Sequence, residues 1–114
     1  MKKNAMSERE IETLKLLKVS LPEFEIYPNM RLADVIKADR KLFNQICKYH
    51  LDFVICDHQA HVIAAVELDD YTHDNNQARE RDAKKDEFLR SADIRLFRIR
   101  LPNEAIQVAK LIRD

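Results

Sequence analysis

The 114-residue sequence contains no glycine. Glycine-rich phosphate loops and dinucleotide-binding fingerprints need glycine where the backbone approaches the ligand closely, so both kinds of site are excluded. Turns must therefore be built from Asn, Asp and Pro.

Cysteine and long apolar runs are also scarce. Cys47 and Cys56 form no CxxC pair and have no partner cysteines for a zinc site, and Cys56 alternates with apolar residues as a small buried side chain does. No apolar run is longer than VIAAV at 62–66, which is far short of a transmembrane helix. Lys2 and Lys3 look like the start of a signal peptide, but no apolar stretch follows them, so we expect a cytoplasmic protein.

The length and composition predict a single globular domain. We expect it to span residues 8–114, after an N-terminal tail at 1–7. With 46% hydrophobic and 35% charged residues, the chain fits neither a disordered nor a membrane protein. The 20 basic and 20 acidic residues cancel, so the net charge says little about partners.

Basic residues are missing from one long segment, residues 51–74, which reads LDFVICDHQAHVIAAVELDDYTHD. It holds six carboxylates and three histidines but no lysine or arginine. Its apolar runs are typical of buried strands, and carboxylates gathered on buried strands repel one another and lose hydration. A metal ion, or a lysine or arginine from elsewhere in the fold, is the usual remedy.

The apolar periodicity predicts an α/β protein. Ser7 and Glu10 form a capping box ahead of apolar residues at helical spacing, which indicates a helix at 7–20 that Pro22 ends. We expect further helices at 76–92 and 104–113, strands at 24–27, 51–57, 62–69 and 94–99, a turn at Pro28-Asn29, a short strand or one helical turn at 32–36, and helical or irregular structure at 39–47.

The connections between these elements predict the sheet. Residues 58–61 are a short link between two strands, which favours an antiparallel hairpin. The helix at 76–92 separates the third strand from the fourth, and such a crossover favours parallel pairing. We therefore expect a mixed sheet with helices on its faces, in the order αβ(β)ββαβα.

Three carboxylates converge in this arrangement. Glu67 and Asp69 lie two apart on one strand and share a face, and hairpin pairing brings Asp52 to the same end. Oxygen ligands in this number suit Mg²⁺ or Mn²⁺ rather than zinc. A divalent ion held there can activate water and stabilise a phosphodiester in the transition state.

Positive charge follows the acidic segment. Lys85 lies in the apolar stripe of the helix at 76–92, so it either reaches the carboxylates or extends to the edge of the stripe as a partly solvated lysine. The other basic residues either pair at helical spacing or meet a polyanion. Phosphate contacts with a nucleic acid are expected from Arg79, Arg81, Lys84 and Arg98.

Four segments together resemble the PD-(D/E)XK nuclease superfamily, and most closely a domain-of-unknown-function family often fused to topoisomerase-type zinc ribbons. They are YPNMRLADVI (27–36), HLDFVICD (50–57), AAVELDDYTHD (64–74) and RERDAKKDEFLRSADIRLFRI (79–99). The resemblance covers nearly the whole chain from about residue 8. It implies a restriction-endonuclease-like fold with the element order already derived.

The resemblance also implies roles for single residues. Asp52 matches the first motif acid of the superfamily and Glu67 the second, while Asp69 stands where the catalytic lysine would be. Lys85, Arg81 or His73 would then replace the charge of that lysine. His73 is a candidate general base or ligand, against the alternative of a hydrogen-bonded turn histidine. An extra acidic ligand would be Glu10 or Glu12, and Asp93 stands where relatives prefer glycine.

The function that these residues imply is a metal-dependent nuclease, a hydrolase that acts on DNA. The alternative is a catalytically degenerate nucleic-acid-binding or assembly domain that kept the fold and lost the lysine. A small-molecule phosphohydrolase is a poorer match, because no compact pocket is implied. The sequence leaves open whether two copies pair as a homodimer to cut both strands.

Overall fold

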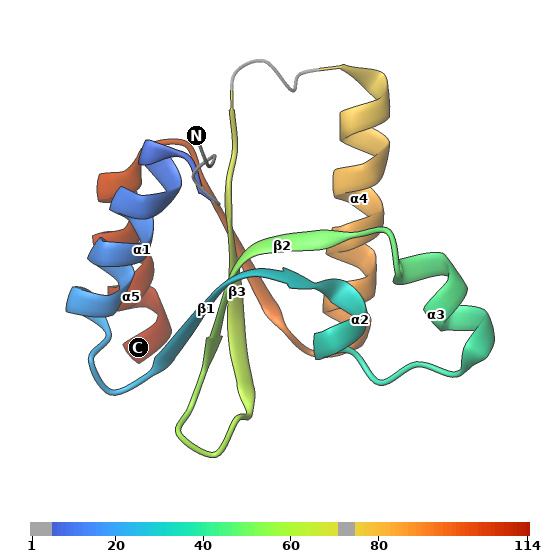
Figure 1. Cartoon of the computed structure of the whole chain (residues 1–114), viewed down its shortest axis with the longest axis horizontal. Helices are drawn as coiled ribbons and strands as arrows, with labels where there is room; N and C mark the ends of the chain where they lie inside the picture. The colour runs from blue at the N-terminus through green and yellow to red at the C-terminus, as the bar shows by residue number, and fades with distance from the viewer. Residues whose placement is uncertain (1–5, 71–74) are drawn as a thin grey trace, which may run out of the picture.

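A computed structural model describes residues 6–70 and 75–114. The described chain forms a four-stranded mixed sheet flanked by helices, which confirms the predicted fold class (Figure 1). The strands are β1 (Glu25–Arg31), β2 (His50–Cys56), β3 (Val62–Leu68) and β4 (Arg95–Ile99). The helices are α1 (Glu8–Ser20), α2 (Leu32–Val35), α3 (Arg40–Ile46), α4 (Asn76–Ser91) and α5 (Ala105–Arg113), with a 3-10 turn, η2 (Pro102–Glu104), before α5.

The strands lie in the order β1-β2-β3-β4. β2 and β3 form the expected antiparallel hairpin, with Phe53 opposite Val66 and a register shift between Ile55 and Cys56. β3 and β4 pair in parallel, because α4 carries the chain back across the sheet between them. The hairpin and the crossover predictions are both confirmed.

Helices cover both faces of the sheet (Figure 1). One buried cluster joins α1 and α5 to Phe53, Ile55 and Val66. A second cluster joins α2, α3 and α4 to Val54 and Ala65 on the opposite face. This division follows from the strand period of two, which sends successive side chains to opposite faces.

The first strand is longer than expected. A turn at Pro28-Asn29 was predicted, but β1 continues through both residues, with Pro28 opposite Phe53 in the ladder. Because β1 is an edge strand, the missing N–H of proline costs it no ladder bond on its outer side. Asn29 takes φ 52°, so it supplies a left-handed kink without ending the strand.

Two other residues also take the left-handed conformation that glycine usually supplies, Ala60 at φ 65° and Asp93 at φ 59°. Ala60 lies in the β2–β3 connection, where the Asp57 carboxylate accepts hydrogen bonds from the backbone N–H groups of Gln59 and His61. Asp93 precedes β4, at the position where the resemblance expects glycine. The turn therefore keeps its geometry with a residue that tolerates it.

The helix ends follow their capping residues. Ser7 caps α1 in the predicted capping box with Glu10, and Met6 packs against the core, so the end of the expected tail at 1–7 is ordered. The segment at 32–36 forms one helical turn, and Asp39 caps α3. In the described part of the chain, no helix is long and apolar enough to cross a membrane.

Candidate active site

The acidic residues of β2 and β3 face α4. Asp52 has the same parity on β2 as Val54, and Glu67 and Asp69 have the same parity along β3 and just beyond its end as Ala65. Val54 and Ala65 belong to the core cluster on the α4 side. Continuing the hairpin register from Phe53 opposite Val66 brings Asp52 opposite Glu67. All three carboxylates therefore occur on one face, at one end of the sheet.

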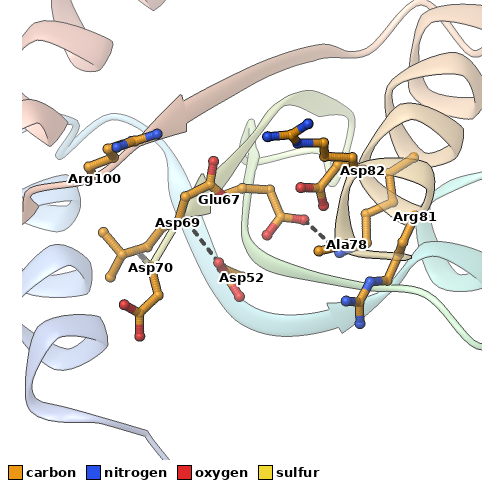
Figure 2. Close-up of a pocket in the computed structure, with 11 residues that line it drawn as sticks. Asp52, Glu67, Asp69, Asp70, Ala78, Arg81, Asp82 and Arg100 are labelled. Atoms are coloured by element: carbon orange, nitrogen blue, oxygen red, sulfur yellow. Dashed lines mark hydrogen bonds and ion pairs between the residues drawn. The ribbon is translucent and has the colours of Figure 1, made fainter. Parts of the chain in front are cut away.

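A pocket of about 330 Å³ opens at this place. Asp52 and Glu67 enter it from β2 and β3, α4 with Arg81 and Asp82 lies on one side of them, and Arg100, which follows β4, lies on the other side (Figure 2). The side chains that carry charge there are Asp52, Glu67, Asp69, Asp70, Arg79, Arg81, Asp82, Lys85 and Arg100.

The central contact of the pocket joins Lys85 to Glu67. The Lys85 Nζ lies 3.1 Å from the Glu67 Oε1, and the two side chains are only 12% and 6% exposed. Lys85 follows Ala78, which is buried, along the inward stripe of α4 and precedes Leu89, which is also buried. The prediction that Lys85 reaches the carboxylates, against a solvated position at the stripe edge, is confirmed.

Glu67 has a perturbed titration. Burial, together with the negative charge of Asp52, raises the pKa of Glu67 to about 8, although Lys85 opposes this shift. Glu67 is one of two buried polar or charged residues in the described chain, and the other is Thr13. A strongly perturbed carboxyl in a pocket, with an identified charge partner, is a common property of functional sites.

Asp52 is held by the backbone of the neighbouring strand. Its Oδ2 accepts a hydrogen bond from the Leu68 N–H at 2.8 Å, one of the two contacts drawn in Figure 2. This bond fixes the Asp52 carboxylate at the end of β3. Asp52 and Glu67 are thus a close pair whose geometry is set by the sheet itself.

Asp69 turns to a different partner. Arg98 on β4 donates to the Asp69 Oδ1 at 3.3 Å and to the Asp86 Oδ1 at 2.9 Å, and it also lies 3.6 Å from the Asp82 Oδ1. Burial raises the pKa of Asp69, and Arg98 works against that rise. For Arg98, burial disfavours the charged form, but Asp86, Asp82 and Asp69 together still raise the pKa of the guanidinium.

The chain matches one known protein family over almost its whole length. A family described as "Protein of unknown function (DUF2726)" matches residues 2–114. This chain belongs to the DUF2726 family. No curated protein and no solved structure gives a significant match to the chain. The DUF2726 match covers the strands and helices that form the pocket, but its description names no activity.

The acidic residues of this DUF2726 chain provide a pair of candidate ligands for a metal ion. Within residues 6–70 and 75–114, no three histidine, cysteine or acidic side chains lie close enough together to hold one. The pair Asp52 and Glu67 still fits Mg²⁺, because that ion is usually held by one or two carboxylates together with water and substrate phosphates. Asp69 as a third ligand stays a prediction, since Arg98 engages its carboxylate.

The other predicted residues of the DUF2726 chain are dispersed around the pocket. Arg79 and Arg81 line it, while Lys84 lines a neighbouring groove. Arg98 points at the aspartates instead of into the pocket. His73 lies outside the described residues.

The first helix takes part in a way that the sequence did not reveal. Glu10 is used in the capping box and Glu12 is exposed, so neither lines the pocket. Arg9 instead donates to the carbonyl oxygens of Asp69 and Arg100.

Asp82 also lines the pocket, and its position three residues before Lys85 on α4 is the signal that could have found it.

Proposed function

We propose that this protein is a metal-dependent phosphodiesterase that cleaves DNA. The observation that carries the proposal is the 3.1 Å contact between Lys85 and Glu67, beside Asp52, in a pocket that arginines also line. Lys85 places a positive charge beside this carboxylate pair, which would replace the lysine that the resemblance to the PD-(D/E)XK superfamily expects at the position of Asp69. Paired acids, a lysine and flanking arginines are the groups that phosphodiester hydrolysis needs.

Asp52 and Glu67 would hold one Mg²⁺ or Mn²⁺ ion. When bound, such an ion activates water and neutralises charge on the phosphodiester. Asp52 keeps the bond from its Oδ2 to the Leu68 N–H. Glu67 keeps the contact between its Oε1 and Lys85. The backbone bond and the lysine therefore preorganise both ligands.

Lys85 would stabilise the negative charge that develops on the phosphoryl oxygens. Its ammonium is largely shielded from water, where a charge interaction is stronger than at the surface. Arg79 and Arg81 would bind the substrate phosphate, since both line the same pocket. Arg98 would remain paired with Asp69, so Asp52 and Glu67 are the metal ligands in this proposal.

Replacement of Lys85 tests the proposal. Lys85→Met removes the charge and keeps most of the side-chain length, so cleavage of DNA with Mg²⁺ or Mn²⁺ should slow by about two to three orders of magnitude. Lys85→Arg should retain part of the activity because it keeps a cation. Lys110→Met on α5 is the matched control, since this exposed lysine lies on the far side of the sheet.

Two results would contradict the proposal at different points. If Lys85→Met cuts as fast as the parent protein, Lys85 has no catalytic role and Arg81 is the next candidate. If the parent protein cuts no duplex, single-stranded or branched DNA with any divalent metal, the alternative of a non-catalytic nucleic-acid-binding or assembly domain takes its place.

A further inference from the structure

A second hollow adjoins the acidic pocket. It has a volume of about 380 Å³ and lies between α4 and the segment that joins α3 to β2. Its lining residues are Lys48, Tyr49, Gln77, Glu80, Arg81 and Lys84, and we call it the basic groove. Arg81 lines both the basic groove and the acidic pocket, so the two hollows adjoin at this side chain.

The cations of the basic groove are available to a ligand. Lys48, Arg81 and Lys84 are all exposed. In the part of the chain that the structure describes, none of these three has an ion-pair partner, whereas Arg98 has three aspartates. Glu80 is the one acidic residue of the groove lining, so three positive charges face one negative charge.

Lys48 is held in place by an aromatic neighbour. Its Nζ lies 5.4 Å from the centroid of the Tyr49 ring, within the range of a cation–π contact. Tyr49 is 5% exposed, and its ring packs against Phe88 at 6.2 Å between centroids. The groove therefore presents an ammonium beside an aromatic ring, and this ring, the one aromatic group among the described lining residues, is too buried to stack on a base.

The helix α4 contributes side chains to both the basic groove and the acidic pocket. Lys84 and Lys85 are neighbours in sequence, but Lys84 lines the groove and Lys85 contacts Glu67 in the pocket. Arg81 lies one turn before both, and side chains three or four residues apart on a helix are about 5–6 Å apart at Cβ. The three cations are therefore neighbours on α4, with Lys85 beside Glu67 in the acidic pocket and Lys84 in the basic groove.

We propose that the basic groove binds the sugar–phosphate backbone of DNA beside the phosphodiester that enters the acidic pocket. Lys48 and Lys84 contact flanking phosphates, and Arg81 contacts the phosphate between the two hollows. This proposal rests on the proposed nuclease function and adds Lys48, from outside the α4 helix, to the substrate contacts. Among the described residues, the groove lining offers charge without an exposed aromatic ring, so these residues contact the backbone and do not select a base sequence.

Salt-dependent DNA binding tests the groove directly. Affinity of the full chain for a labelled DNA oligonucleotide is measured by fluorescence anisotropy in Ca²⁺ over a series of salt concentrations. Each phosphate contact contributes about 0.7–0.9 to the slope of log affinity against log salt. Lys48→Gln with Lys84→Gln should therefore bind more weakly and lower that slope by roughly 1.4–1.8. Lys18→Gln with Lys110→Gln, two exposed lysines on α1 and α5, is the charge-matched control.

A gain of affinity provides a second test. Glu80→Gln removes the one carboxylate of the groove, so it should bind DNA more tightly than the parent protein at every salt concentration. Every variant should keep the melting temperature of the parent protein, because the exchanged side chains are exposed, and measuring it verifies that each variant is folded.

The outcomes separate the groove from the nuclease proposal. If the parent protein binds DNA and the Lys48/Lys84 double variant keeps its affinity and salt slope, the groove proposal is overturned while cleavage still decides the function. A Glu80→Gln variant that binds no more tightly also counts against the groove. If the parent protein neither binds nor cuts DNA, both proposals fail.

Discussion

The charge state of Glu67 is coupled to folding through its raised pKa. Its pKa is raised from 4.5 to about 8, chiefly by burial and then by Asp52. Between these two values the folded chain holds a proton on Glu67 that the unfolded chain releases. The folded state then binds more protons than the unfolded state, so stability falls as the pH rises through this window.

The pH dependence of Glu67→Gln measures this effect. Glutamine resembles the protonated carboxyl and cannot ionise, so the variant should lose less stability than the parent protein between about pH 5 and pH 8. Urea unfolding at several pH values provides the free energies. Glu12→Gln, at an exposed position on α1, should follow the parent curve. Equal pH slopes for Glu67→Gln and the parent protein would show that Glu67 is ionised throughout.

At the residue scale, part of the site was predictable. Asp52 and Glu67 followed from hairpin pairing, and Lys85 followed from the inward stripe of its helix. The partner of Asp69 was not predictable, because the position of Arg98 relative to α4 depends on how β4 packs under that helix. Sequence spacing gives the direction of a side chain within its own element, whereas pairing between elements needs the tertiary fold.

At the element scale, Arg98 connects β4 to α4 through ion pairs. Its guanidinium contacts Asp82 and Asp86, one turn apart on α4, and reaches Asp69 beyond the end of β3. The Arg98 side chain is 25% exposed, so these contacts are better shielded from water than a surface ion pair. Without the arginine, three aspartates would face one another.

Arg98→Met should therefore destabilise the protein by about 2 kcal/mol near neutral pH, the range for losing hydrogen bonds between charged groups. The loss should shrink in acid, where protonated aspartates no longer repel one another. Thermal or urea unfolding at neutral and acid pH gives both values. Arg113→Met breaks the exposed Arg113–Glu23 pair and should have a much smaller effect. Equal losses in the two variants would contradict a fastening role for Arg98.

The elements themselves were largely predictable because their periods are clear. The apolar runs of β2 and β3, the short link between them and the helix-former content of α4 predicted the hairpin and the crossover. The length of β1 was missed because Pro28 and Asn29 have turn chemistry, and only their edge position makes them compatible with a strand. α2 and α3 are too short for a periodic signal, so packing of Leu32 and Ile46 into the core decides their form.

At the scale of the whole molecule, the two faces of the sheet differ in role. The α1 and α5 side contains an apolar cluster, while the α4 side combines an apolar cluster with the acidic pocket and the basic groove. The formal net charge of zero does not reveal that an acidic pocket and a basic groove lie on the α4 side. Lys48 could not be assigned from the sequence, because only the fold brings the α3–β2 segment beside α4.

Metal binding in the acidic pocket should change the stability of the whole domain. An ion that binds the folded pair Asp52 and Glu67, but not the unfolded chain, stabilises the protein by linkage. At a metal concentration 100-fold above the dissociation constant the gain is about 2.7 kcal/mol, on the order of 10 °C in melting temperature for a domain of this size. Mg²⁺ or Mn²⁺ should therefore raise the melting temperature of the parent protein.

The pair of variants Asp52→Asn with Glu67→Gln separates the site from general ion effects. It should abolish the metal-induced rise, because amide oxygens replace both carboxylates. Glu12→Gln should keep the rise, since Glu12 lies outside the pocket. A parent protein whose melting temperature does not change at saturating metal would falsify the metal site, whatever the DNA-binding experiments give.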